Sequence, residues 1–309
     1  MDLTTRYLGL TLPHPLMLGA SPLTEDLDMV ARLEDAGAAA IVMHSLFEEE
    51  IVGYTMKPDE YLEQLQRIKQ RVRVPVIASL NGTNSEGWLH YARLLEQAGA
   101  DALELNFYYV ATNMFEDAAS VERRLVDIVA VLKESIALPL AVKLSPFYSA
   151  LPHLASQLDR MGIDGLVLFN RFYQPDINPK SREMVMRIHL SDSPELLLRL
   201  RWIAILRNQL NASLALSGGV HEPMDAIKAV MVGADGVQLV SALLRRGPGC
   251  LTAMRREFER WGEANAYETI DHLRGQMSLA GQQDGDVERA HYQRILQSWH
   301  VPGSPVAGQ

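Results

Sequence analysis

The 309-residue chain has a single cysteine, Cys250. One thiol cannot form an internal disulfide, hold an iron–sulfur cluster or complete a cysteine-rich zinc site, so the composition indicates a reducing compartment. The chain also has no uninterrupted apolar run of about 18 residues, the length that a membrane-spanning helix needs. Its first residues, MDLTTRYLGL, lack the basic and apolar regions of a signal peptide. We therefore expect a cytoplasmic protein that does not act on a membrane.

An excess of positive charge is absent as well. The chain has 29 Lys and Arg residues against 38 Asp and Glu residues, which gives a formal net charge of −9. An acidic surface repels nucleic acids and anionic lipids, so neither is expected as a partner. The hydrophobic fraction of 48% is ordinary for a globular protein. A small-molecule substrate is the expected ligand.

A repeated pattern precedes four of the apolar runs. Each copy has a glycine, two or three small or acidic residues and then an apolar run; the copies are AGAAAIVM ending at Met43, AGADALELN ending at Asn106, MGIDGLVLF ending at Phe169 and VGADGVQLV ending at Val240. Glycine can adopt the left-handed conformation that ends a helix. A run that is apolar on both faces suits a parallel strand covered by helices. The pattern predicts four helix ends, each followed by a buried strand.

Four further apolar runs alternate with these, at residues 14–20, 74–80, 138–144 and 213–219. Amphipathic stretches lie between the runs, near residues 25–35, 84–98, 115–135, 149–161, 194–209, 222–232 and 249–262. Eight short strands that alternate with helices favour a (β/α)8 barrel over an open doubly wound sheet.

The expected architecture is an α/β fold, a (β/α)8 TIM barrel over residues 1–262. Residues 263–309 are predicted to form a C-terminal helical extension packed on the barrel, with frayed last residues. The segment 46–62 is longer than a minimal connection, and we interpret it as a mobile cover over the site.

The site of such a barrel is formed at the C-terminal ends of its strands. Reading those positions gives Ala20, Ser21, His44, Ser45, Asn81, Asn106, Lys143, Asn170, Gly218, Gly219 and Ser241. The set has neither a carboxylate pair nor an HxH motif. It therefore does not favour glycoside hydrolysis or a metal site.

The segment SGGVHEP, residues 217–223, has the features of a phosphate cradle. Gly218 and Gly219 would let backbone N–H groups approach an anion closely, and a helix beginning near Glu222 would present its N-terminus to it. Val240 and Ser241, at the end of the eighth strand, could complete the cradle. The alternative is that the two glycines only form a tight turn.

Lys143 lies within an apolar strand, where a charged group needs a partner. It could be a cation beside a redox ring, or a member of a structural ion pair. Asn81, Asn106 and Asn170 could recognise an amide-rich heterocycle, or simply tolerate the turns that follow strands. His44 could act as a general acid or base, or have only a structural role.

With these residues in place, the chain resembles the dihydroorotate dehydrogenase family of FMN-containing barrels over about residues 5–280. The most specific segments are LGASPLT (18–24), ALELNFYY (102–109), LPLAVKLSP (138–146), GLVLFNR (165–171) and LSGGVHEPMDAIKAVMVGADGVQLVSALLRRGP (216–248). The resemblance implies that FMN is the cofactor. It also implies roles for individual residues: Ala20, Ser21 and Ser45 line the flavin, Asn106 and Lys143 contact its ring, Gly218, Gly219, Val240 and Ser241 hold its phosphate, and Asn81 and Asn170 lie on the substrate side.

The chain departs from the family at the substrate half of the site. Tyr109 stands where the family has a cysteine or serine base, and His44 stands where it has a lysine. The substrate motif of the family, expected around 50–65, is not recognisable in IVGYTMKPDEYLEQL. Tyr109, Lys143 and His44 are therefore the candidate catalytic residues. A tyrosine can act as a base only if its pKa falls well below about 10.

The first hypothesis is an FMN-dependent oxidoreductase that transfers a hydride between a substrate carbon and flavin N5, with dihydroorotate and pyrimidine biosynthesis as one option for its substrate and pathway. The second is a non-redox lyase or isomerase that binds a phosphorylated substrate and forms a Schiff base at Lys143. The third is a flavin-binding partner subunit with little activity of its own. The resemblance further implies a homodimer, and any iron–sulfur relay would have to lie on a separate electron-transfer partner.

Overall fold

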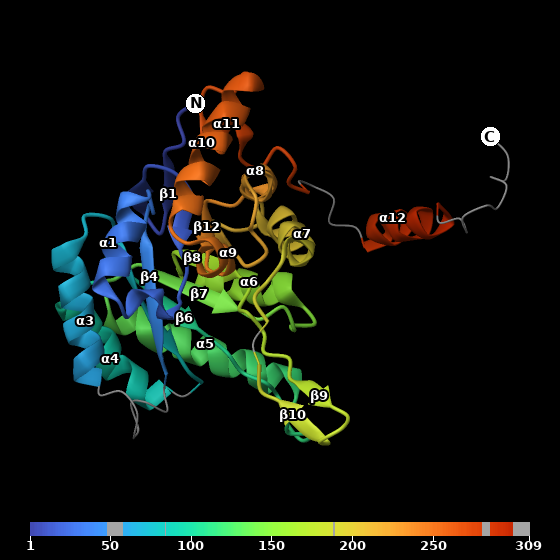
Figure 1. The fold of residues 1–309 in the computed structure, drawn as a ribbon. Helices are drawn as coiled ribbons and strands as arrows, with labels where there is room; N and C mark the ends of the chain where they lie inside the picture. The colour runs from blue at the N-terminus through green and yellow to red at the C-terminus, as the bar shows by residue number, and fades with distance from the viewer. Residues whose placement is uncertain (48–57, 84, 188, 280–284, 299–309) are drawn as a thin grey trace, which may run out of the picture.

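The structure is a computed structural model that describes residues 1–47, 58–83, 85–187, 189–279 and 285–298. Eight parallel strands form a closed barrel in the order β11-β12-β3-β4-β5-β6-β7-β8 (Figure 1). The strands are β3 Leu16–Leu18, β4 Ile41–Phe47, β5 Val76–Asn81, β6 Ala102–Asn106, β7 Leu140–Leu144, β8 Gly165–Leu168, β11 Ser213–Ser217 and β12 Gly236–Leu239. The predicted barrel and its eight strands are confirmed.

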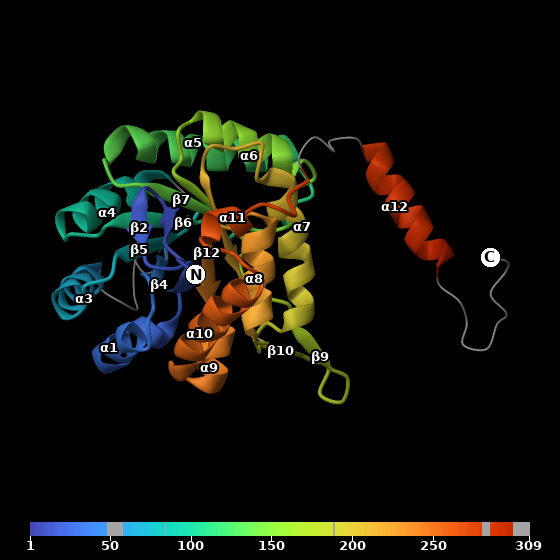
Figure 2. The same ribbon diagram turned by 90° about the horizontal axis from the view of Figure 1, so that it is seen from above.

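Helices follow the strands and surround the barrel (Figure 2). They are α1 Leu27–Asp35, α3 Pro58–Arg71, α4 Ser85–Gln97, α5 Ala118–Ser135, α6 Leu151–Arg160, α7 Leu196–Leu206, α8 Pro223–Val232, the short α9 Ser241–Arg246 and α10 Gly249–Ala264. Gly233 ends α8 with a φ of 118°, and a side chain there would lie 2.5 Å from Arg207 Cγ. The other three glycines of the repeat, Gly37, Gly99 and Gly162, also have positive φ values, as the pattern predicts.

The segment interpreted as a mobile cover is partly a regular helix. Residues 48–57 lie outside the described residues, but α3 begins at Pro58, so residues 58–62 form its first turn. Tyr61 is fully buried on this helix, and its hydroxyl donates to the carbonyl oxygens of His44 at 2.9 Å and Ser79 at 3.2 Å. Leu65 and Ile68 follow it at helical spacing and are also buried.

An N-terminal hairpin lies at the opposite end of the barrel from the predicted site. Its strands are β1 Thr5–Tyr7 and β2 Leu10–Leu12, paired antiparallel. Tyr7, Leu8 and Leu12 are buried against side chains from the barrel interior. This apolar plug fills the N-terminal end of the barrel.

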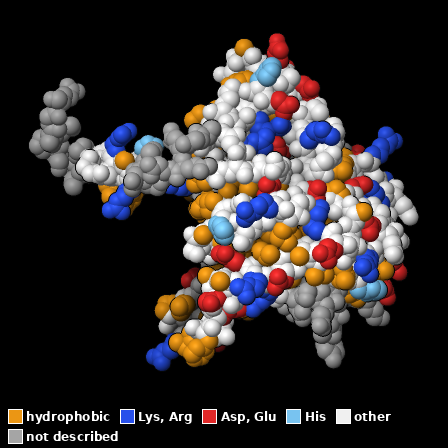
Figure 3. Space-filling model, turned by 180° about the vertical axis from the view of Figure 1, so that it is seen from behind, with side chains coloured by type: hydrophobic (Ala, Val, Ile, Leu, Met, Phe, Trp, Pro, Cys, Tyr) orange, Lys and Arg blue, Asp and Glu red, His pale blue; other side chains and the backbone are white. Residues whose placement is uncertain are grey.

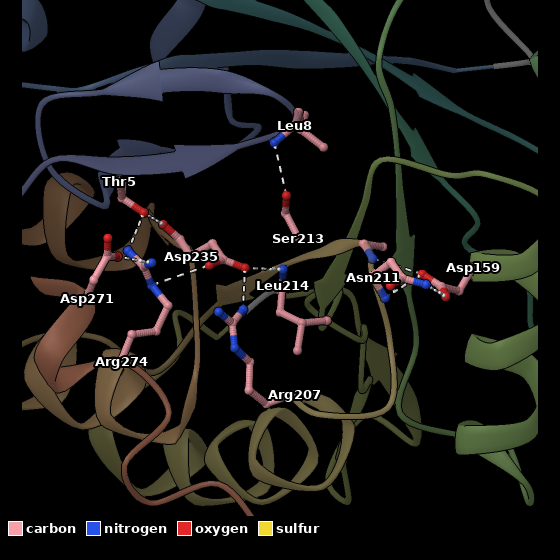
Figure 4. A network of polar contacts seen from close by, with 11 residues as sticks. Thr5, Leu8, Asp159, Arg207, Asn211, Ser213, Leu214, Asp235, Asp271 and Arg274 are labelled. Carbon is pink, nitrogen blue, oxygen red and sulfur yellow. Dashed lines mark hydrogen bonds and ion pairs between the residues drawn. The ribbon is translucent and has the colours of Figure 1, made fainter.

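Asp235 connects distant parts of the chain at that end (Figure 4). Its Oδ2 lies 2.8 Å from Arg207 Nη1, and its Oδ1 lies 3.3 Å from Arg274 Nε. Arg274 also donates to Thr5 Oγ1 at 2.7 Å, and Thr5 donates to the Asp235 carbonyl at 3.0 Å. Burial raises the pKa of Asp235, against the lowering effect of the two arginines. The network joins the N-terminal hairpin, α7 and the C-terminal segment to the start of β12.

The C-terminal extension has two parts. Residues after α10 include α11 Ile270–Leu273, and they pack on the barrel helices: Gly275 N donates to Val230 O at 3.1 Å, and Leu279 N donates to Ala204 O at 2.9 Å. The last helix, α12 Gly285–Gln297, lies apart from the barrel in both ribbon views (Figures 1 and 2). Among the described residues, no helix is both long and apolar enough to cross a membrane.

A second hairpin projects from the barrel between β8 and α7 (Figure 1). Its strands are β9 Asp176–Asn178 and β10 Glu183–Val185. Hydrophobic side chains gather on its surface, seen at the lower left of Figure 3. Ile177 is 68% exposed, Met184 60% and Met186 82%. This exposed apolar surface lies at the end of the barrel where the site is predicted.

Candidate active site

A cavity of about 720 Å³ lies at the C-terminal ends of the barrel strands. It brings together nearly all of the residues that the sequence predicts: Ala20, Ser21, His44, Ser45, Asn81, Asn106, Lys143, Asn170, Gly218, Gly219, Val240 and Ser241 line it. Tyr109 is the predicted residue that is not in the lining. Within the described residues, no cluster of His, Cys, Asp and Glu is arranged to hold a metal ion.

Lys143 is held by two buried partners, one on the adjacent strand β6 and one on β12, which is not adjacent to β7. Its Nζ donates to Glu104 Oε1 at 3.1 Å and to Gln238 Oε1 at 3.0 Å. Gln238 Nε2 in turn donates to Glu104 Oε2 at 2.5 Å. Lys143 therefore belongs to a structural ion pair, one of the two roles predicted for it, and it also lines the cavity.

Sequence reasoning missed Glu104 and Gln238. Each is a polar residue in an otherwise apolar strand segment, Glu104 in ALELN and Gln238 in GVQLV. A polar residue in such a segment indicates a buried polar contact, so the sequence did contain a sign of both residues. The ion pair also bears on the chemistry of Lys143. A lysine that forms a Schiff base must bring its Nζ to a carbonyl carbon, whereas the Nζ of Lys143 is held by Glu104 and Gln238. The geometry does not favour the lyase hypothesis.

Two polar atoms in the lining have no hydrogen-bond partner among the described residues. They are Ser21 Oγ and Asn106 Oδ1, both buried. A buried polar atom without a partner is costly, so a ligand with its own donors and acceptors would stabilise this part of the cavity. Nearby, Ser45 Oγ lies 2.8 Å from Ser79 Oγ, and Asn170 Nδ2 donates to the Lys143 carbonyl at 3.4 Å.

The turn after β11 is the segment predicted to form a phosphate cradle. Gly218 and Gly219 have φ values of 90° and 83°. A Cβ on Gly219 would lie 2.6 Å from the backbone nitrogen of Leu196, so a side chain does not fit there. The following helix α8 begins with a capping box between Glu222 and Asp225.

Ser191 completes this end of the cavity, and sequence reasoning missed it. Its Oγ accepts from Gly219 N at 3.1 Å and donates to Ser241 Oγ at 3.0 Å. The backbone N–H of Ser191 also donates to Ser241 Oγ, at 3.1 Å. These hydrogen bonds join three segments: the turn between β11 and α8, the start of α9, and the loop before α7.

His44 lines the cavity in a fixed orientation. Its backbone N–H donates to Thr24 Oγ1 at 2.8 Å, and the same hydroxyl lies 3.1 Å from the ring Nδ1. The ring meets Tyr61 edge-on, with centroids 5.0 Å apart. Thr24 lies in the turn Pro22–Thr24 and is fully buried, so the hydroxyl that positions the imidazole is itself held in place.

The two tyrosines after β6 point to different places. Tyr109 donates to Glu116 Oε2 at 2.5 Å and has the Arg124 guanidinium 4.6 Å from its ring centroid. Tyr108 lines the cavity and accepts from the backbone of Tyr173 at 3.0 Å. The resemblance assigns the base to Tyr109, but it is Tyr108 that the structure brings to the other site residues.

A family model and three relatives are similar to this chain in sequence. A sequence model of the family described as dihydroorotate dehydrogenase matches residues 53–261. The catalytic subunit of dihydroorotate dehydrogenase B (NAD(+)) from Thermoplasma acidophilum is 26% identical over 297 residues, which cover 89% of this chain and 98% of that protein. The Methanocaldococcus jannaschii protein of the same description is 22% identical, over 79% of this chain and 88% of that protein. Subunit PreA of the NAD-dependent dihydropyrimidine dehydrogenase from Escherichia coli K12 is 22% identical, over 89% of this chain and 76% of that protein.

Proposed function

The chain belongs to the dihydroorotate dehydrogenase family, and on that premise we propose that it is an FMN-dependent oxidoreductase acting on a CH–CH bond. The observation that supports the proposal is the cavity at the strand ends, whose lining includes nearly all of the residues to which the resemblance gives flavin or substrate roles. When bound, FMN supplies the redox chemistry, a hydride transfer between a substrate carbon and flavin N5. The protein supplies binding, orientation and proton transfer.

The residues present fit this cofactor. The turn at Gly218 and Gly219 has no room for side chains and suits close approach of a phosphate group. With Val240 and Ser241, these glycines would hold the phosphate. Ser21 Oγ and Asn106 Oδ1 offer unpaired polar atoms to a heterocycle. Lys143, together with Asn106, would contact the ring, and its positive charge would favour a ring that becomes negative on reduction.

The substrate side of the cavity would contain Asn81, Asn170 and His44. Oxidation of a CH–CH bond releases a hydride from one carbon and a proton from its neighbour. Of the three candidate catalytic residues, Tyr109 lies outside the cavity lining and Lys143 is paired with Glu104, whereas His44 lines the cavity with its ring held beside Thr24. We assign the proton transfer to His44, with Lys143 acting on the flavin.

The substrate is proposed to be dihydroorotate, which would place the enzyme in pyrimidine biosynthesis. Relatives named as dihydroorotate dehydrogenases support this assignment. A dihydropyrimidine without the carboxylate is the second candidate, because one relative is named as a dihydropyrimidine dehydrogenase subunit.

The decisive experiment is anaerobic mixing of the purified protein with dihydroorotate or dihydrouracil while the flavin absorbance is followed. The protein should be yellow, release FMN on denaturation and lose its flavin absorbance with the true substrate. A colourless protein with no affinity for FMN would contradict the proposal. Bleaching by dihydrouracil alone would move the substrate away from dihydroorotate.

Assembly is proposed on two observations. The exposed apolar surface of the β9–β10 hairpin is of the kind that marks protein interfaces, and it supports a homodimer. Relatives named as subunits support a separate electron-transfer partner as well. Light scattering of the purified protein would test the dimer.

The single cysteine supports a reducing compartment, which we take to be the cytoplasm.

A further inference from the structure

Arg199, on helix α7, places a positive charge beside the turn formed by Gly218 and Gly219. Its side chain is buried, with 5% of the residue exposed, and it lines the cavity. A Cβ built on Gly218 would lie 2.9 Å from Arg199 Nη2, so the guanidinium is in direct contact with the turn. Arg199 therefore places a full positive charge beside the residues that would hold a phosphate.

The hydrogen bonds of this guanidinium go mainly to neutral groups. Its Nε donates to the Ser217 carbonyl, and its Nη1 donates to the Glu195 carbonyl at 2.7 Å. The carboxylate of Glu195 is 3.9 Å from Nη2, and the same Oε2 atom is in closer contact with Arg171. Arg199 thus shares a distant carboxylate with a competing arginine.

The other two cations of the lining differ in this respect. Lys143 is paired with Glu104 at 3.1 Å, and Arg171 has the close contact with Glu195. Burial lowers the pKa of Arg199. The negative charge of Glu195 raises that pKa, and the positive charge of Arg171 partly offsets the effect of Glu195. A buried cation without a close partner is costly, and a second anion at this place would offset that cost.

We propose that Arg199 is the counter-charge for the phosphate group of the cofactor, and that it gives the site its preference for FMN over riboflavin. The proposal rests on the proposed function, because it takes FMN as the ligand. A phosphate monoester carries close to two negative charges at neutral pH. The Ser241 hydroxyl, which accepts from Ser191, can donate to a phosphate oxygen, and Arg199 adds a positive charge that can neutralise the phosphate.

The test compares the affinities of FMN and riboflavin, which differ only in the phosphate. Full-length protein is freed of flavin and titrated with each, and binding is followed by quenching of flavin fluorescence. Arg199→Met should weaken FMN binding by about 10- to 100-fold, the size of a lost charge-assisted contact, and leave riboflavin binding within about twofold. Arg201→Gln, an exposed arginine two residues along α7, is the matched control and should leave both affinities unchanged.

A second readout does not depend on flavin. Inorganic phosphate should raise the melting temperature of the flavin-free wild type, because it binds the folded state at this place. The increase should be much smaller in Arg199→Met. Unchanged phosphate stabilisation in that variant would contradict the proposal.

Arg199 also supports the turn through Ser217, so its replacement by methionine could impair folding. Arg199→Lys keeps the charge but loses the planar fork that reaches both carbonyls. If the charge is what matters, Arg199→Lys retains most of the preference for FMN. The inference would be overturned if a folded Arg199→Met protein preferred FMN over riboflavin as strongly as the wild type does. It would also be overturned if a folded Arg199→Lys protein lost that preference completely. A wild type that binds neither flavin would instead refute the proposed function.

Discussion

Glu104 Oε1 accepts a hydrogen bond from Lys143 Nζ at 3.1 Å, and both residues are buried below the cavity. Their strands, β6 and β7, are adjacent, with Asn106 in register with Lys143. The ion pair fixes the ammonium on the cavity wall. It also means that neither residue can be changed alone without leaving the other unpaired.

Glu104→Gln should therefore destabilise the protein. Removing one partner of a buried ion pair leaves an uncompensated charge and costs about 3 kcal/mol of the free energy of unfolding. Urea denaturation would measure the loss, with the exposed Glu268→Gln as a control that should be close to wild type. A Glu104→Gln protein as stable as the control would mean that the pair does not hold Lys143 in place.

His44→Gln should slow reduction of the flavin by substrate. Loss of a general base typically costs about 100-fold or more in the chemical step, while the FMN content should stay unchanged. Stopped-flow measurement of flavin bleaching gives the rate, and His153→Gln, exposed on α6, serves as the control.

The two tyrosines can be compared in the same assay. Tyr109→Phe should leave the bleaching rate close to wild type, because the Tyr109 hydroxyl is bonded to Glu116 outside the cavity lining. A large loss of rate in Tyr109→Phe together with a normal rate in His44→Gln would assign the base to Tyr109.

Gly219→Ala should abolish retention of FMN and lower stability. Its left-handed conformation costs a non-glycine residue roughly 1–2 kcal/mol, and the added Cβ would meet the backbone of Leu196 at 2.6 Å. The flavin content of the purified protein and its melting temperature are the measurements. Gly249→Ala is the matched control, since nothing lies within 4 Å of a Cβ built there. The idea fails if both variants retain FMN equally.

His14 should make stability depend on pH. It is buried, its Nδ1 accepts from Leu16 N at 3.3 Å, and burial together with Arg255 lowers its pKa to about 4 from the usual 6.5. Because the folded-state pKa is lowered, the unfolded chain binds more protons between these values. The stabilisation is complete above pH 6.5 and is lost as pH falls towards 4, at up to about 1.4 kcal/mol per pH unit.

His14→Gln should remove this contribution. Urea denaturation of both proteins between pH 7.5 and about 4.5 would show a steeper loss of stability in the wild type. Parallel curves would show that His14 is not the group responsible.

The barrel could be predicted because its signals are local. Each of the four repeat glycines adopts the left-handed conformation within its own segment, and each apolar run forms its strand. The helix α3 was missed although Tyr61, Leu65 and Ile68 have helical spacing, because the segment was interpreted as a cover. The β1–β2 hairpin was missed because strands of three residues leave little periodicity to detect.

The site was predictable where a residue directly ends a strand, and less so elsewhere. Lys143 and Asn106 could be placed because barrel geometry fixes the direction of strand ends. Arg199 reaches the cavity from a helix, and Ser191 from a loop, so no spacing in the sequence relates them to Gly218. Tyr108 and Tyr109 lie beyond the last strand residue, where the alternation of side-chain directions no longer decides which one faces the cavity.

The network around Asp235 has a consequence for the order of folding. Thr5 and Arg274 are 269 residues apart in the sequence, yet both contact the same aspartate region. The strands and helices of the barrel can form from contacts that are nearer in sequence, whereas this junction requires the closure of a very long loop, which costs more conformational entropy. A chain shortened to end before residue 274 would lack the junction.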